Sequence, residues 1–122
     1  MAMSKNVLQF VCFRSPYGGS FFKSLLRLEQ TLKRDGTEMI YLFHTDTSDI
    51  GWVQDLIKEG KKIYFLTGNF LKDILTVKKI VVKHNIKYLH AHFAGIKFFC
   101  LFKVVKMLYR KDLFIFRHLR NH

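Results

Sequence analysis

The apolar residues of this chain form short continuous runs that alternate with longer segments of helical period. Residues 7–13 are apolar on both faces of an extended chain, which is typical of a central parallel strand covered by helices. In residues 20–34, by contrast, Phe21, Leu25 and Leu28 recur at the spacing of one buried helix face, with basic residues opposite. The chain therefore opens with a predicted strand followed by an amphipathic helix.

The same alternation continues to the end of the chain. Gly36 and Gly60 are expected to end two helices, because glycine takes the left-handed conformation after a last helical turn without steric cost. Asn85 is expected to end the third helix in the same way, and Ser48 or Asp49 to cap the second. The remaining helices are predicted at residues 48–58, 70–84 and 95–108, the last of them mostly buried, and the remaining strands at residues 37–43, 62–66, 86–91 and 112–117.

Five strands separated by four helices with short connections predict a Rossmann-like α/β domain. Such a chain forms three layers, in which right-handed crossovers place helices on both faces of a mostly parallel five-stranded sheet. No linker or low-complexity segment divides residues 1–122, so a single domain is predicted. The last predicted strand ends five residues before His122, and no predicted helix covers the edge of the sheet. We therefore expect the domain to be incomplete.

Composition adds a strong positive charge to this picture. With 21 Lys and Arg against 9 Asp and Glu, the formal net charge is +12, which favours a membrane surface, phosphorylated ligands or nucleic acid as partners. Nucleic acid is the least favoured, because the aromatic residues lie in apolar strands and stripes and do not alternate with Lys and Arg on one surface. The lysines of the third and fourth helices form either a solvated face or a contact with an anionic membrane. They are Lys72, Lys78, Lys79, Lys83, Lys97, Lys103 and Lys106.

The amino terminus and the cysteines indicate the compartment. Residues 1–6 lack the apolar core of a signal peptide. The most apolar helical segment, residues 94–109, is interrupted by three lysines and is too short to span a bilayer. Cys12 and Cys100 lie far apart in apolar runs, as expected of buried free thiols in a reducing compartment. We expect a cytoplasmic protein, either free or peripheral to the inner face of the membrane.

Candidate binding residues follow the predicted strands, because ligands of open parallel sheets bind beyond the carboxyl ends of the strands. Gly18, Gly19 and Ser20 connect the first strand to the first helix. Paired glycines let the backbone approach a ligand closely, and the start of a helix binds phosphate. Arg14 and Tyr17 lie in the same connection. The candidates after the fourth and fifth strands are His92, His118 and His122.

Missing motifs exclude several classes of enzyme. The sequence contains neither Gly-x-Gly-x-x-Gly nor Gly-x-x-x-x-Gly-Lys-Ser/Thr, which argues against dinucleotide-dependent dehydrogenases and P-loop NTPases. Gly-x-Ser-x-Gly, the nucleophile motif of many hydrolases, is also absent. Since there is no Cys-x-x-Cys and no pairing of histidines with cysteines, no metal site is predicted.

The order of these signals resembles the N-terminal domain of the family-4 glycosyltransferases, which are retaining enzymes of the GT-B fold. The resemblance rests on VLQFVCFRSPYGGSFFKSLLRLEQTLKRDGTEMIYLF, on IKYLHAHF and on the histidine-bearing end of the last strand, and it covers nearly the whole chain. In the family, the fourth strand ends in a segment similar to D-x-x-H-x-H. Here Lys87 stands where an aspartate is common.

The resemblance implies transfer of a sugar from a nucleotide-sugar, which is a substrate and not a cofactor, to a glycan or lipid-linked acceptor. It implies that Gly18, Gly19 and Ser20 approach the diphosphate of the donor, and that His92 and His118 are the catalytic residues at the cleft. The N-terminal domain of such enzymes mainly holds the acceptor. The acceptor-binding candidates are Arg14, Tyr17 and His122.

The resemblance also implies that activity requires a second, donor-binding domain. The donor-binding C-terminal domain of the family, with its Glu-x7-Glu motif, is missing from the sequence. We therefore expect the chain to be inactive without a C-terminal domain or a partner subunit that supplies one. Two alternatives stay open: a non-catalytic basic α/β module that binds an anionic membrane or nucleic acid, and a gene remnant.

Overall fold

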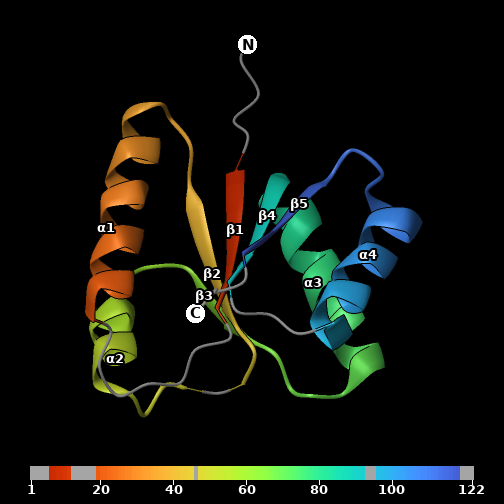
Figure 1. Cartoon of the computed structure of the whole chain (residues 1–122), viewed down its shortest axis with the longest axis horizontal. Coiled ribbons are helices and arrows are strands. Elements are labelled where there is room, and N and C mark those ends of the chain that lie inside the picture. Colours follow the sequence, from red (N-terminus) through yellow and green to blue (C-terminus); the bar gives the residue numbers. More distant parts are fainter. Residues whose placement is uncertain (1–5, 12–18, 46, 93–95, 119–122) are drawn as a thin grey trace.

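The computed structural model describes residues 6–11, 19–45, 47–92 and 96–118. Strands and helices alternate throughout this part of the chain, as the hydrophobic pattern predicts (Figure 1). The elements in order are β1 (Asn6–Val11), α1 (Gly19–Arg34), β2 (Met39–Phe43), α2 (Gly51–Lys58), β3 (Ile63–Phe65), α3 (Phe70–Lys83), β4 (Ile86–His92), α4 (Ile96–Tyr109) and β5 (Phe114–His118).

All strand pairs of the sheet are parallel, and the strand order is β3-β2-β1-β4-β5. β2 and β3 are added in turn on one side of β1. The chain then returns past β1, and β4 and β5 are added in turn on its other side. This reversal places α1 and α2 on one face of the sheet and α3 and α4 on the other (Figure 1). The predicted Rossmann-like α/β fold with three layers is confirmed.

The core has one apolar cluster on each face of the sheet. On the α3/α4 face, Phe10 of β1 is fully buried, and its ring lies 5.0 Å from that of Phe98 and 4.9 Å from that of Phe102, both on α4. On the α1/α2 face, the ring of Phe43 packs against Trp52 at 5.9 Å. The abundant phenylalanines thus lie partly where the sequence predicts them, in the core.

Local turn chemistry explains most of the helix ends. Gly36, Gly60 and Asn85 have φ values of 78°, 77° and 50°, so all three adopt the predicted left-handed conformation. The start of α2 was predicted wrongly. Ile50 occupies the cap position instead of Ser48 or Asp49 and forms no side-chain cap, because a turn closed by the Ile50 N–H on the Thr47 carbonyl precedes the helix.

Near the amino ends of the strands, a buried polar network connects β1 to the end of α3. Asn6 donates from Nδ2 to the carbonyl of His84 and accepts through Oδ1 from the backbone N–H of Glu38 at 3.0 Å. The His84 ring in turn lies 2.7 Å from the Tyr64 hydroxyl through Nε2. This network holds His84 in a buried position.

The buried position of His84 predicts a loss of stability in mild acid. Burial lowers the pKa of His84 below its ordinary value of 6.5, nearby Lys62 lowers it further, and Glu38 opposes the shift. The unfolded chain therefore binds a proton at this histidine more readily, and the free energy of unfolding falls as pH drops below 6.5. Urea unfolding across this pH range should show the decrease, and His84→Gln should reduce it. An identical decrease in both proteins would contradict this assignment.

Candidate functional site

The strand order creates one natural place for a ligand. The connections that leave β1 and β4 run to helices on opposite faces, because the strand order reverses between these two neighbours. Open parallel sheets bind their ligands in the crevice that such a reversal opens at the carboxyl ends of the strands. The candidate site is therefore the carboxyl end of β1 and β4, together with that of β5 beside them.

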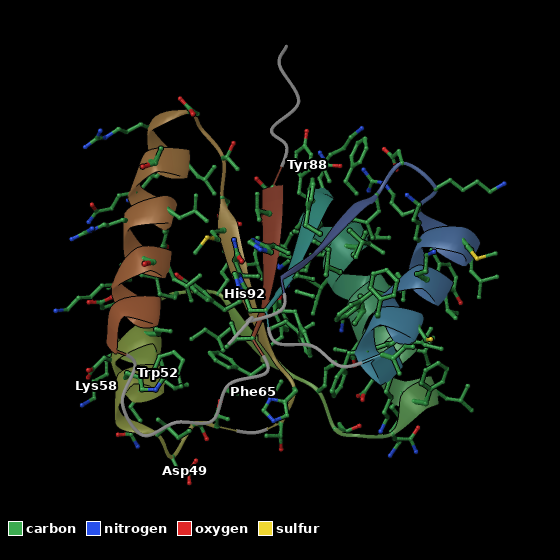
Figure 2. The ribbon with its side chains drawn as sticks, in the orientation of Figure 1. Asp49, Trp52, Lys58, Phe65, Tyr88 and His92 are labelled. Carbon is green, nitrogen blue, oxygen red and sulfur yellow. The ribbon has the colours of Figure 1, made fainter. Side chains whose placement is uncertain are left out.

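Polar side chains from these strands share one face of the sheet. Leu8 and Phe10 belong to the core cluster under α3 and α4, so Gln9 between them points to the α1/α2 face. The same alternation on β4 places Leu89 and Ala91 in that cluster, and His90 and His92 on the α1/α2 face. Figure 2 shows His92 near the carboxyl end of β4, with Tyr88 toward the other end of the strand.

A buried hydrogen bond joins Gln9 to His92. The His92 Nε2 and Gln9 Oε1 atoms lie 2.5 Å apart, Gln9 is fully buried, and His92 is 6 % exposed. Gln9 Nε2 is buried as well and has no hydrogen-bond partner among the described residues. The assignment of the Gln9 amide oxygen and nitrogen can be exchanged, because either atom can form a hydrogen bond with the imidazole. In both assignments the second amide atom is buried without a partner among the described residues. An unpaired buried amide costs about 1–3 kcal/mol, so it is retained here at some cost to stability.

His90 extends this polar cluster along β4. The His90 and His92 rings lie 3.9 Å apart between centroids, with an interplanar angle of 37°. Each imidazole offers a donor and an acceptor when neutral. Gln9, His90 and His92 therefore form a polar cluster whose donors and acceptors are of the kind that bind hydroxyl groups or an anionic oxygen.

The predicted catalytic residues lie beside each other in the sheet. His92 is the last residue of β4 and pairs in register with His118, the last residue of β5. Val11, the last residue of β1, pairs with His92 on the other side. The carboxyl-end rule therefore brings His92 and His118 to neighbouring positions, although the structure does not describe the His118 side chain.

The other predicted site residues are only partly tested by the structure. Gly19 and Ser20 form the first two positions of α1, which is the helix start that the sequence proposes for phosphate. Gln9 was missed by the sequence analysis, although a lone glutamine inside a buried apolar strand is itself a signal. The remaining candidates lie outside the described residues: Arg14, Tyr17, Gly18 and His122.

A second polar cluster, after β3, has a structural explanation. The Asp73 carboxylate is buried and accepts hydrogen bonds from the backbone N–H groups of Thr67 and Gly68 at 2.8 and 3.0 Å, and from the Thr67 hydroxyl at 2.9 Å. Asn69 caps α3 by accepting from the N–H of Lys72 at 3.1 Å. These groups are satisfied by each other and shape the connection between β3 and α3.

An open cavity of about 390 Å³ lies at the opposite end of the sheet. The two helix-to-strand corners line it at the amino ends of β2 and β3, and four of its six charged side chains form ion pairs with each other. Lys61 contacts Glu29 at 3.0 Å, and Lys62 contacts Glu38 at 2.8 Å. Because this cavity has as many acidic as basic side chains and lies away from the reversal of strand order, it is a weaker candidate than the Gln9–His92 site.

No family model, curated protein or solved structure matches the chain. Among the described residues, no three His, Cys, Asp or Glu side chains are grouped so that they could hold a metal ion. The candidate site therefore depends on its own geometry: the reversal of strand order, the Gln9–His92 hydrogen bond and the adjoining histidines.

Proposed function

We propose that this chain is the acceptor-side portion of a retaining glycosyltransferase that uses a nucleotide-sugar donor. The buried Gln9–His92 hydrogen bond at the reversal of strand order is the observation that carries the proposal. Polar groups at that position of a Rossmann-like sheet are suited to bind a hydroxylated or phosphorylated ligand. The resemblance to family-4 glycosyltransferases supplies the reaction class.

In the proposed reaction, the bond between the anomeric carbon of the sugar and the diphosphate breaks, and the nucleoside diphosphate leaves with the bonding electrons. A new bond forms between the anomeric carbon and the oxygen of an acceptor hydroxyl, and the hydroxyl proton passes to the departing diphosphate. Gln9 acts as a positioning residue, because its side chain fixes the orientation of the His92 ring. His92 and His118 are the proposed catalytic residues that touch the sugar.

We assign the donor and the acceptor to different residues at the carboxyl ends of the strands. The N–H groups at the start of α1, together with Gly18, Gly19 and Ser20, approach the diphosphate, since a helix start favours negative charge. The acceptor binds beside them, with Arg14, Tyr17 and His122 as its proposed contacts. The chain is proposed to need a C-terminal domain or a partner subunit for turnover, and to act on a glycan or lipid-linked acceptor at the cytoplasmic side of the membrane.

Ligand binding tests the proposal without requiring turnover. Isothermal titration calorimetry of the chain with UDP-glucose, UDP-N-acetylglucosamine, GDP-mannose and short oligosaccharides should reveal saturable binding of at least one. Gln9→Leu should weaken that binding about tenfold or more, because a buried hydrogen bond and the orientation of His92 are lost together.

A matched control separates the site from the substitution itself. Gln54→Leu makes the same chemical change at an exposed position of α2 and should leave the affinity unchanged. Absence of saturable binding to every compound, or equal weakening by Gln9→Leu and Gln54→Leu, would contradict the proposal.

A further inference from the structure

The net positive charge of the chain arises in one half of the sequence. Residues 1–59 contain seven Lys and Arg and seven Asp and Glu, whereas residues 60–122 contain fourteen Lys and Arg and two Asp and Glu. The second half supplies α3 and α4, which lie side by side on one face of the sheet (Figure 1). Seven of these fourteen basic residues, all of them lysines, lie on α3 and α4.

The outer side of α3 combines an apolar stripe with a basic stripe. Leu71, Leu75 and Val82 are 73 %, 58 % and 58 % exposed and recur at helical spacing. Beside them runs a stripe of lysines that the structure also exposes, as the sequence predicts. These lysines are Lys72, Lys79 and Lys83.

The outer side of α4 is also apolar, contrary to the prediction that this helix is mostly buried. Only one side of α4 packs into the core, through Leu101, Phe102 and Val105. Large apolar side chains of α4 remain exposed, and so does the thiol that was predicted to be buried. These exposed residues are Ile96, Cys100, Met107, Leu108 and Tyr109. Large exposed apolar patches mark protein or membrane interaction sites.

Acidic side chains are absent from the surface that α3 and α4 share. Within residues 70–83 and 96–109 the sequence has one acidic residue, Asp73, and its carboxylate is buried against Thr67 and Gly68. Asp112, in the turn after α4, is paired with Arg110 at 2.9 Å and with Lys87 at 3.4 Å. The exposed surface of this layer therefore carries apolar groups and positive charge without compensating negative charge.

We propose that the outer surface of the α3/α4 layer binds an anionic lipid bilayer. Apolar side chains enter the boundary between headgroups and acyl chains, while the flexible lysine stems carry their ammonium groups to the lipid phosphates. Six of the large exposed apolar side chains on these helices are not aromatic, and two, Phe70 and Tyr109, are aromatic. All basic residues of both helices are lysines, whereas nucleic-acid surfaces favour exposed aromatics and arginine. No helix of the described part is long and apolar enough to cross a membrane, so the proposed contact is peripheral.

Co-sedimentation with vesicles tests this proposal. The full chain should pellet with vesicles of phosphatidylcholine mixed with phosphatidylglycerol, and not with vesicles of phosphatidylcholine alone. Two variants address the two components of the surface. Lys72→Glu/Lys79→Glu/Lys83→Glu should weaken binding about tenfold or more, and Leu71→Ser/Leu75→Ser should weaken it at unchanged charge.

A charge-matched control decides whether the surface or the overall charge is responsible. Lys23→Glu/Lys33→Glu/Arg34→Glu makes the same change in net charge on exposed positions of α1, on the other face of the sheet. This control should retain most of the binding. Equal loss in both triple variants, equal binding to both kinds of vesicle, or no effect of the two serines would overturn the proposal. An oligonucleotide could also displace the chain from the vesicles. If the Leu71→Ser/Leu75→Ser variant binds that oligonucleotide as tightly as the wild-type chain does, the surface binds nucleic acid and the proposal is overturned.

A second measurement avoids charge variants. In a Cys12→Ser protein, an environment-sensitive fluorophore on Cys100 of α4 should shift its emission to the blue when phosphatidylglycerol vesicles are added. A fluorophore on a cysteine placed at Lys23 of α1, in Cys12→Ser/Cys100→Ser/Lys23→Cys, should not shift. The reverse pattern would overturn the proposal. Neither assay contains a nucleotide-sugar, so its outcome is independent of the proposed glycosyltransferase function.

Discussion

Phe10→Ala is expected to lower the free energy of unfolding by about 3–5 kcal/mol, because the truncation leaves a cavity in the centre of the sheet. Phe10 is fully buried on β1 and packs edge-on against Phe102 and at a tilt against Phe98. Removing its ring therefore loosens α4 from the sheet as well. A loss of this size is a large part of the total stability of a small domain.

Urea unfolding followed by far-ultraviolet circular dichroism measures this effect. Phe116→Ala is the matched control, because it removes the same ring from β5 where 51 % of the side chain is exposed. The control should lose about 1 kcal/mol or less. Similar losses in the two variants would contradict the assignment of Phe10 to the core.

Asp73→Ala is expected to lower the free energy of unfolding by about 3 kcal/mol, because three hydrogen bonds to a buried carboxylate are lost. Two of the donors are the backbone N–H groups of Thr67 and Gly68, which then lack their partner. Gly68 is already held at a φ of 93°, so the loop loses the contact that fixes this conformation. Asp73→Asn should lose less, because it keeps one acceptor oxygen.

Urea unfolding also measures this loss, and Asp55 provides the control. Asp55→Ala removes an exposed carboxylate from α2 and is expected to change stability by about 0.5 kcal/mol or less. The expected order of loss is Asp73→Ala, then Asp73→Asn, then Asp55→Ala. A neutral Asp73→Ala variant would show that the hydrogen bonds after β3 do not stabilise the fold.

The fold could be predicted from the sequence because its signals are local. The glycine corners at Gly36 and Gly60 and the stop at Asn85 each depend on a few neighbouring residues. The buried stripe predicted for α1 is correct at Leu25 and wrong at Leu28, which is 37 % exposed. Alternation of strands and helices then leaves few topologies. The start of α2 was not predictable in this way, since the turn from Thr47 to Ile50 offers the backbone a competing hydrogen bond.

The candidate site was only partly predictable. The ends of strands are visible in the sequence, so His92 and His118 could be placed at one edge of the sheet. The role of Gln9 depends on the pairing of β1 with β4, which brings together residues 83 positions apart. Burial of α4 was overestimated because apolar composition alone does not say which sides of a helix are covered. The roles of Arg14, Tyr17, Gly18 and His122 stay predictions.

Nuclear magnetic resonance of the histidine rings tests the central claim most directly, which is that a sugar ligand binds at the carboxyl ends of β1, β4 and β5. A protein labelled at its histidines would be titrated with the nucleotide-sugar or oligosaccharide that binds in calorimetry. We predict saturable shifts of the His90, His92 and His118 rings, with little change at His84, which lies in the network at the amino ends of the strands. Shifts at His84 without shifts at His92 would contradict the account.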